Sequence, residues 1–258
     1  MEPFSFPQIN PVILHIWGPI ALRWYNLAYI LGIILGLTLL KWWGKKEGRI
    51  SSTHAEQFLP WCILAIVIGG RVGEFLFYST ETQTFWDILY IWEGGMSFHG
   101  AFIGMVVTGY FFSKRNGLSF LGWMDHIALV APIGIFLGRM ANFINDELYG
   151  RVTNVWWAVL FPNGGYLPRH PSQLYEAFLE GILLFSILNY VAYFRRGLKQ
   201  SGKISSIFLC SYGIFRFIGE FFREPDGWIG PITTGQGLSL LMVMGGILLF
   251  VFKRRKTH

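Results

Sequence analysis

Seven apolar segments, most of them close to 20 residues long, follow one another along this chain of 258 residues. A helix of about 20 such residues crosses the ~30 Å hydrocarbon core of a bilayer. Only 14% of the residues are charged, against roughly 25% in soluble domains. A transmembrane barrel would instead show alternating segments of about 10 residues, which this sequence lacks. We therefore expect an all-α polytopic membrane protein.

The expected membrane-spanning helices form a single membrane domain over residues 1–258. They are 18–40, 57–77, 95–112, 120–140, 173–194, 204–222 and 236–252. Two further segments are expected outside the membrane: an irregular N-terminal extracytoplasmic arm, 1–17, and an extracytoplasmic head loop, 141–172, between the fourth and fifth spans. The arm holds no Lys or Arg, so it lacks the basic start of a cleavable signal peptide.

The basic residues predict the orientation, because cytoplasmic loops carry an excess of Lys and Arg. Fourteen follow the odd-numbered spans: Lys41, Lys45, Lys46, Arg49, Lys114, Arg115, Arg195, Arg196, Lys199, Lys203, Lys253, Arg254, Arg255 and Lys256. The opposite side carries three, Arg151, Arg169 and Arg223. We expect the N-terminus outside and the C-terminus in the cytoplasm. Since this segregation accounts for the net charge of +6, no nucleic-acid partner is expected.

Several ionisable residues fall inside the expected spans, where each arginine costs about 2.5–3.5 kcal/mol at mid-bilayer. At 1.5 Å per helical residue, most of them lie in one layer beneath the outer surface. They are Arg23, Arg71, His99, Arg139, Glu176, Glu180 and Arg216, whereas Asp125 and His126 lie near the inner end of the fourth span. This layer predicts a polar cavity that opens to the outer leaflet.

The spacing within the spans predicts which side chains pair. Arg216 and Glu220 can pair across one turn, on a stripe that also holds Tyr212 and Arg223. Arg71 and Glu74 are three residues apart and can also pair. Whether this pair has a purely structural role stays open. Arg139 has no carboxylate on its own turn, and Arg223 adds positive charge to the stripe. We expect a cationic cavity, suited to bidentate recognition of a phospholipid phosphate.

His99 lies among glycines at the start of the third span. A histidine at the edge of a polar cavity can accept a proton near neutral pH, and a histidine fixed for packing is the alternative. Cys62 and Cys210 lie in apolar segments, so neither a disulfide framework nor a cysteine metal site is implied.

The most specific motif is Gly138-Arg139-x-x-Asn142-Phe143-Ile144-Asn145-x-Glu147-x-x-Gly150. Four other motifs accompany it: Arg23-Trp24-Tyr25, the segment from Gly95 to Gly100, the segment from Arg169 to Glu176, and Phe215-Arg216-Phe217 with the segment from Glu220 to Asp226. In this order, over nearly the whole chain, they resemble the prolipoprotein diacylglyceryl transferase family. The chain departs from many members at Arg23 and Asn26, where they have His and Gly, and at Ala101, where they have Gly.

The resemblance implies an enzyme of the bacterial cytoplasmic (inner) membrane whose active site faces the outer leaflet. Its substrates would be phosphatidylglycerol and a prolipoprotein signal peptide with a lipobox cysteine. The cysteine thiol would take the diacylglyceryl group, forming a thioether and releasing glycerol phosphate, as the first step of lipoprotein maturation. No metal and no cofactor are implied.

Residue roles follow from the resemblance and the cavity together. We expect Arg139 and Arg216 to hold the phosphate, and His99 to assist deprotonation of the thiol, with Tyr25 as a hydrogen-bonding neighbour. The arginines could equally lower the pKa of the thiol, which is about 8.5 for a free cysteine. The expected substrate-binding residues are Arg139, Asn142, Glu147, Gly150, His170, Glu220 and Arg223. Asn142, Asn145 and Glu147 either orient Arg139 or cap its helix.

Two other classes fit a polytopic membrane protein. A transporter or channel would place polar groups at several depths and often contains internal repeats, which are not evident here. A seven-helix sensor would need a ligand pocket without a phosphate-binding cluster.

Overall fold

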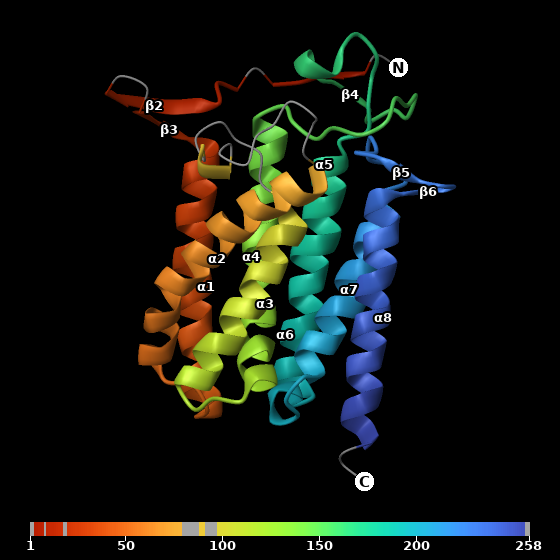
Figure 1. Cartoon of the computed structure of the whole chain (residues 1–258). Helices are drawn as coiled ribbons and strands as arrows, with labels where there is room; N and C mark the ends of the chain where they lie inside the picture. The colour runs from red at the N-terminus through yellow and green to blue at the C-terminus, as the bar shows by residue number, and fades with distance from the viewer. Residues whose placement is uncertain (1–2, 8, 18–19, 79–87, 91–96, 256–258) are drawn as a thin grey trace. The chain divides into compact units, whose positions relative to one another are not determined.

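The computed structural model describes residues 3–7, 9–17, 20–78, 88–90 and 97–255, which are mostly helical (Figure 1). The chain forms two compact units, each described by itself. One comprises Met1–Leu39 with Ile127–His258, and the other comprises Leu40–His126.

The helices account for most of both units. Helices α1 (Trp24–Glu47) and α4 (Phe120–Ile144) contribute residues to both units, and α2 (Ser52–Tyr78) and α3 (Phe98–Arg115) belong to the second. In the first unit, α5 (Ser172–Glu176), η4 (Ala177–Leu183) and α6 (Leu184–Phe194) form one continuous helical segment. The short η5 (Gly197–Lys199), α7 (Lys203–Gly219) and α8 (Thr234–Arg255) follow.

Within the described residues, five helical segments are long and apolar enough to cross a membrane. They are Trp24–Glu47, Ser52–Leu76, Phe120–Ile144, Ser172–Phe194 and Thr234–Lys253. The chain is therefore a multi-pass membrane protein, and these segments correspond to five of the seven predicted spans. The other two predicted spans, 95–112 and 204–222, coincide with α3 and α7, and their crossing stays a prediction. Residues 95–96 lie outside the described part of the chain.

The N-terminal arm is not irregular, which corrects the prediction, and the first helix begins later than residue 18. Strand β2 (Val12–Trp17) pairs antiparallel with β3 (Ile20–Arg23), and α1 begins at Trp24. Arg23 therefore lies exposed at the end of a strand, not inside a span. A short apolar run such as Val12–Trp17 fits a strand or a buried helix equally well, and pairing with β3 decides between them.

The head between α4 and α5 is built around aromatic side chains. It contains β4 (Val159–Leu160) and η3 (Pro162–Gly164), and β4 pairs in parallel with β1 (Phe4–Ser5) from the arm. Phe6 is buried with Val159 and Phe161, and Phe143 and Tyr149 pack against them. The arm is thus part of the head, and Figure 1 shows both at the same end of the helices.

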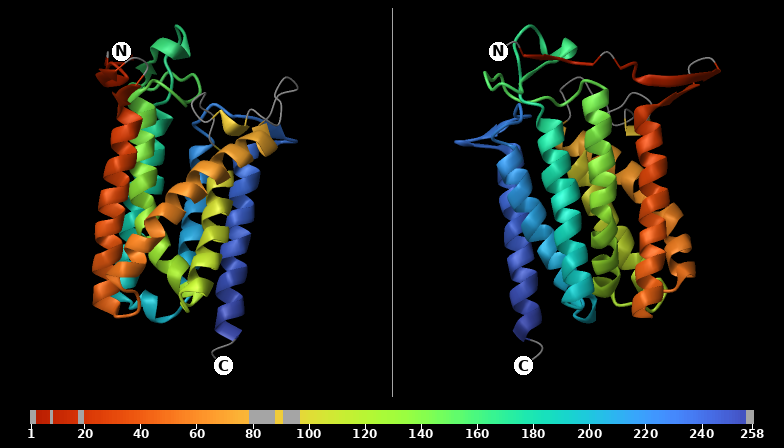
Figure 2. Two further views of the ribbon diagram at one scale, coloured as in Figure 1. Left: turned by 60° about the vertical axis from the view of Figure 1, so that its left-hand side comes forward. Right: turned by 180° about the vertical axis from the view of Figure 1, so that it is seen from behind.

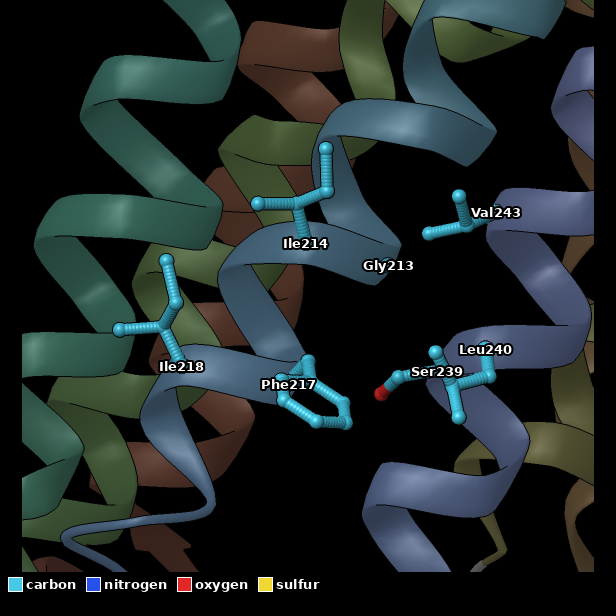
Figure 3. A pocket seen from close by; sticks show the side chains of 7 residues that line it. All are labelled: Gly213, Ile214, Phe217, Ile218, Ser239, Leu240 and Val243. Atoms are coloured by element: carbon cyan, nitrogen blue, oxygen red, sulfur yellow. The ribbon is translucent and has the colours of Figure 1, made fainter.

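Small residues let neighbouring helices approach closely in each unit, as is typical of helix packing in membranes. In the second unit, a Cβ added at Gly69 of α2 would lie 2.5 Å from the carbonyl oxygen of Gly100 in α3. In the first unit, a Cβ at Gly213 of α7 would lie 2.8 Å from the Ser239 carbonyl of α8, and Figure 2 shows α8 alongside α7. An apolar cavity of about 170 Å³ remains between these two helices (Figure 3).

A hairpin of β5 (Trp228–Ile229) and β6 (Ile232–Thr233) joins α7 to α8. It ends directly at the first residue of α8. The hairpin therefore fixes where α8 begins, next to the end of α7.

Candidate functional site

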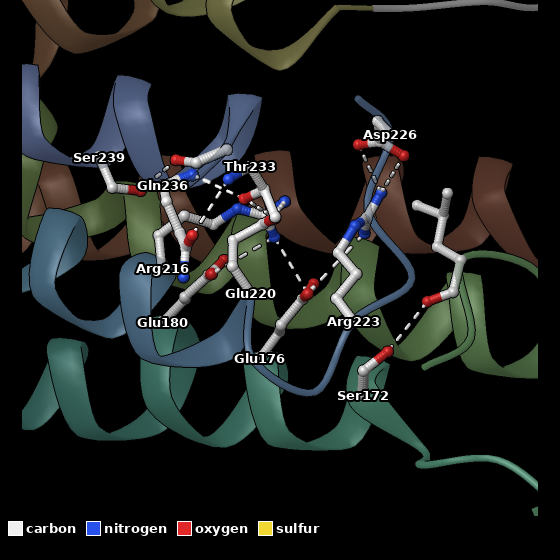
Figure 4. Close-up of polar contacts among 12 residues, drawn as sticks. Ser172, Glu176, Glu180, Arg216, Glu220, Arg223, Asp226, Thr233, Gln236 and Ser239 are labelled. Atoms are coloured by element: carbon white, nitrogen blue, oxygen red, sulfur yellow. Dashed lines mark hydrogen bonds and ion pairs between the residues drawn. The ribbon is translucent and has the colours of Figure 1, made fainter. Parts of the chain in front are cut away.

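Arg139 of α4 and Arg216 of α7 meet on one buried carboxylate. Arg139 Nε lies 2.9 Å from Glu176 Oε2, and Arg216 Nη1 lies 3.0 Å from Glu176 Oε1. Glu176 comes from α5, so three helices converge at this point (Figure 4 shows the Arg216 side). The structure therefore brings together the two arginines that the sequence predicted to share a cavity.

Two further glutamates and one further arginine complete this group. Glu180 Oε2 lies 3.5 Å from Arg139 Nη2, and Glu180 Oε1 lies 3.7 Å from Arg216 Nη1. The predicted pair of Arg216 and Glu220 is confirmed, at 2.5 Å between Nη2 and Oε1. Arg223 Nη1 lies 3.8 Å from Glu176 Oε1, and its Nη2 lies 3.1 Å from Asp226 Oδ2. We call Arg139, Glu176, Glu180, Arg216, Glu220 and Arg223 the arginine–glutamate cluster.

The expectation of a cationic cavity is wrong, because the arginines of the cluster are matched by the same number of glutamates. Glu176 and Glu180 stand on a different helical segment from the arginines, so the spacing within the helices of the arginines does not reveal these pairs. Buried charges need such partners, because desolvation costs several kcal/mol for each ion. Not all hydrogen-bonding capacity is used, however. Within the described residues, the buried Nε of Arg223 has no hydrogen-bond partner.

A widened turn begins directly after Glu176 and contains Glu180. The segment Ala177–Leu183 is a π-helix, a form that appears mostly as single turns and often at functional sites. Both Glu176 and Glu180 are fully buried there. Gly181 in the same turn allows α4 to approach, since a Cβ added to it would lie 2.6 Å from the Cβ of Phe136. Glu176 at the end of α5 and Glu180 in the π-helical segment thus present their carboxylates to arginines of α4 and α7.

Tyr25, Asn142 and Glu147 form a second polar group in the same unit. The Tyr25 hydroxyl donates a hydrogen bond to Glu147 Oε2 at 2.8 Å, and Asn142 Nδ2 donates to the Tyr25 oxygen. The chain at Glu147 is held by Gln173, whose Nε2 donates to the Glu147 carbonyl at 2.6 Å. Asn142 and Glu147 therefore hold Tyr25, which differs from both predicted roles, and Arg139 is oriented by Glu176 and Glu180.

Gly150 lies where two backbone segments come closest. Its N–H donates to the His170 carbonyl at 2.9 Å, and it forms a β-bridge with Arg223. A Cβ added at Gly150 would lie 2.6 Å from the His170 oxygen. Arg151 strengthens the junction, since its Nε donates to the Arg223 carbonyl at 2.9 Å. Only glycine fits here, and the junction ties the head to the chain beyond α7.

His170 lines a largely apolar pocket of about 400 Å³ beside the head. The pocket is formed by Trp157, His170, Leu174, Tyr175, Phe178, Leu179 and Phe222. The Tyr175 hydroxyl accepts a hydrogen bond from Trp157 Nε1 at 2.5 Å and lies 3.2 Å from His170 Nδ1. Burial lowers the pKa of His170 below its ordinary value. The contacts of His170 are therefore aromatic, and its predicted role in substrate binding stays a prediction.

His99 belongs to the second unit, Leu40–His126, and lies in the first turn of α3. The helix is capped by Ser97, whose Oγ accepts a hydrogen bond from the Gly100 N–H at 3.2 Å. This places His99 closer to the helix end than the predicted span of 95–112 did. Its role as a base stays a prediction.

Sequence reasoning missed Thr233, which touches the cluster from the end of β6, directly before α8. Its Oγ1 donates a hydrogen bond to Glu220 Oε2 at 2.8 Å. The signal was present in Thr233-Thr234-Gly235-Gln236, because Thr followed three residues later by Gln is the pattern of a capping box.

Comparison with known proteins gives one consistent result. The model of the family described as "Prolipoprotein diacylglyceryl transferase" matches residues 11–252. A relative from Rickettsia africae (strain ESF-5) is 47% identical over 95% of this chain and 97% of its own length. Another, from Actinobacillus pleuropneumoniae serotype 3 (strain JL03), is 45% identical over 98% of both chains. Both relatives carry the name phosphatidylglycerol–prolipoprotein diacylglyceryl transferase.

Proposed function

This chain belongs to the prolipoprotein diacylglyceryl transferase family, and we propose that it transfers a diacylglyceryl group from phosphatidylglycerol to prolipoproteins. The acceptor is the thiol of a lipobox cysteine in the signal peptide. Its thiolate attacks the terminal glycerol carbon of the diacylglyceryl group. A C–S bond forms, the C–O bond to phosphate breaks, and glycerol phosphate leaves with the electron pair. The thiol proton goes to a base.

The arginine–glutamate cluster is the observation that carries this proposal. Arginine suits phosphate because its planar guanidinium gives two parallel hydrogen bonds. Arg139 and Arg216 are held in place by Glu176 from two sides, so their orientation is set before a lipid arrives. Fixed donors of this kind stabilise the negative charge that develops on a leaving phosphate. Arg223, with its unbonded Nε, supplies further donor capacity.

The matched charges of the cluster have a consequence for binding. A phosphodiester brings one negative charge to a site where the arginines already have carboxylate partners. Binding therefore requires an arginine to exchange part of a carboxylate contact for the phosphate. The long contacts of Glu180, 3.5 Å to Arg139 and 3.7 Å to Arg216, make Glu180 the partner exchanged most readily. Glu220 and Glu176, at 2.5 and 3.0 Å from Arg216, keep that arginine in position.

Other residues have supporting roles in the proposal. His99 accepts the thiol proton, because histidine is the side chain suited to proton transfer near neutral pH and because it lies among glycines in the sequence. Tyr25, fixed by Asn142 and Glu147, lines the same reaction site. The pocket beside His170 takes apolar substrate, because its lining is largely apolar and aromatic.

We also propose seven membrane crossings, with the N-terminus outside, the C-terminus in the cytoplasm and the active site facing the outer leaflet of the bacterial inner membrane. Pairing of β1 with β4 supports an even number of crossings between them. Since α1, α2 and α4 are three candidate spans, we take α3 as the fourth. The bridge between Gly150 and Arg223 likewise supports a crossing of α7 after Ser172–Phe194. The Lys and Arg distribution supports the orientation.

The test is a transfer reaction in detergent with phosphatidylglycerol and a synthetic lipobox peptide. We expect the peptide to gain the mass of one diacylglyceryl group, detected by mass spectrometry, and glycerol phosphate to appear in equal amount. A peptide with serine in place of the cysteine is the control and should stay unmodified. The proposal fails if folded protein leaves the cysteine peptide unmodified under conditions in which a known family member modifies it.

A further inference from the structure

Thr233 joins the start of α8 to the buried carboxylate of Glu220. Its Oγ1 donates to Glu220 Oε2 at 2.8 Å, while Glu220 Oε1 pairs with Arg216 Nη2 at 2.5 Å. Glu220 is therefore held at both oxygens, once by Arg216 of α7 and once by Thr233, the residue directly before α8. Thr233 and Glu220 are both 1% exposed, so water does not compete for this contact. Figure 4 shows the side chains of Thr233, Glu220 and Arg216 in sequence.

The hydroxyl of Thr233 is fixed by a reciprocal cap. It accepts a hydrogen bond from the Gln236 N–H at 3.1 Å, and Gln236 Oε1 accepts one from the Thr233 N–H at 3.1 Å. A hydroxyl has a single hydrogen to donate. With the cap supplying the hydrogen bond that the oxygen accepts, that hydrogen is directed to Glu220. The cap thus orients the side chain of Thr233, and Thr233 in turn orients Glu220.

Gly235 keeps the next turn of α8 open for the same carboxylate. A Cβ added at Gly235 would overlap the carboxyl group of Glu220. The carboxylate can therefore lie against the first turn of a 22-residue helix, where the helix dipole favours negative charge. Two features at the start of α8, the hydroxyl of the preceding Thr233 and the missing side chain of Gly235, act on one residue of the cluster.

From this arrangement we propose that Thr233 is a positioning residue for the transfer reaction, acting on Arg216 through Glu220. This inference rests on the proposed function, in which Arg216 holds the phosphate. Without the hydroxyl, Glu220 Oε2 loses its donor and the carboxylate is free to turn. Arg216 then follows either Glu220 or the glutamates of the Ser172–Phe194 helix, Glu176 and Glu180, and leaves the orientation that suits the leaving phosphate.

The experiment compares three variants with wild type in the detergent transfer reaction. Thr233→Val removes the hydroxyl at nearly equal side-chain volume, whereas Thr233→Ser keeps a hydroxyl. Ser51→Ala is the matched control, because Ser51 and His54 form the same reciprocal cap at the start of α2, with hydrogen bonds of 3.1 and 3.3 Å, and do not belong to the cluster. The rate constant kcat and the KM for the lipobox peptide are measured separately for each.

We expect Thr233→Val to lower kcat by about 10- to 100-fold, the range found when an outer partner of a functional side chain is lost, with the peptide KM within about threefold of wild type. Thr233→Ser should retain most of the wild-type kcat. Ser51→Ala should keep the wild-type kcat even if its melting temperature falls as far as that of Thr233→Val. Equal kcat for Thr233→Val and wild type, or an equal loss in Thr233→Ser and Thr233→Val, would overturn the inference.

Failure of the proposed function and failure of the positioning role give different results. Wild-type protein that transfers no lipid contradicts the proposed function, whereas active wild type with an unaffected Thr233→Val contradicts only the positioning role. If Thr233→Val does not fold, Gly235→Ala provides the second measurement, because its methyl displaces Glu220 while the hydroxyl stays. A folded Gly235→Ala with wild-type kcat then overturns the inference, and a selective loss of kcat supports it.

Discussion

The hydroxyl of Tyr25 donates a hydrogen bond of 2.8 Å to Glu147, 122 positions further along the chain. This bond connects the first turn of α1 to the residues that follow α4. It ties the beginning of the head to the first turn of α1, in addition to the pairing of the head with the arm.

Replacing Tyr25 by Phe is expected to lower the transfer rate by roughly 10-fold, because a typical lost hydrogen bond of about 1 kcal/mol also frees Asn142 and Glu147. The rate is measured in the detergent reaction with phosphatidylglycerol. Tyr29→Phe serves as the control, since Tyr29 stacks beside Tyr25 at 6.3 Å between ring centroids and is itself 54% exposed. Equal rates for Tyr25→Phe and wild type would remove Tyr25 from the site.

Arg216→Lys should lower kcat by about 100-fold or more, because lysine keeps the charge but loses the two parallel donors that hold carboxylate and phosphate. Arg139→Lys is expected to behave alike. The exposed Arg195 provides the control, and Arg195→Lys should be as active as wild type. Wild-type kcat in both cluster variants would exclude bidentate phosphate binding by these arginines.

Glu180→Gln should lower the free energy of unfolding by roughly 3–5 kcal/mol, since removing one partner of a buried ion pair leaves an uncompensated charge. The measurement is equilibrium unfolding in mixed detergent micelles. In the exposed pair of Lys41 and Glu56, at 2.6 Å with 58% of the Glu56 side chain accessible, Glu56→Gln should cost less than about 1 kcal/mol. A smaller loss for Glu180→Gln than for Glu56→Gln contradicts the account of the cluster.

His170 should make stability depend on pH. Burial lowers its pKa from the ordinary value of 6.5, so below pH 6.5 the unfolded chain binds a proton that the folded chain does not. Stability therefore falls as pH drops from 6.5 toward the lowered pKa and is constant above 6.5. His170→Gln should flatten this part of the profile, as followed by melting temperature between pH 5 and 8. An unchanged slope in the variant would assign the dependence to other groups.

The membrane class and the central arginines could be predicted from the sequence because both depend on local signals. Apolar length identifies spans, and the spacing of Arg216 and Glu220 identifies a pair within one helix. Contacts between helices are different, because no spacing in the chain reports them. For this reason the sequence identifies Glu176 as an ionisable residue of an expected span, but does not predict its role as the shared partner of Arg139 and Arg216.

The N-terminal strands show a second limit. Residues 12–17 are apolar except for His15, and a short run of this kind does not distinguish strand from helix. Their state depends on a partner strand, and the place of Phe6 depends on Phe161 far along the chain. Thr233 illustrates the reverse case, since its capping pattern is a local signal for the helix start but carries no sign of the carboxylate that the hydroxyl also binds.

The parallel pairing of Phe4–Ser5 with Val159–Leu160 sets an order of events during synthesis. The arm is made first, yet its partner strand emerges only after α1 to α4 have been made. Through that interval Phe6 lacks the aromatic neighbours that bury it, and an exposed strand edge invites wrong pairing. In the part of the chain from the arm to the head, the head is therefore among the last elements to fold. Shortening the arm should delay folding of the head without changing membrane insertion.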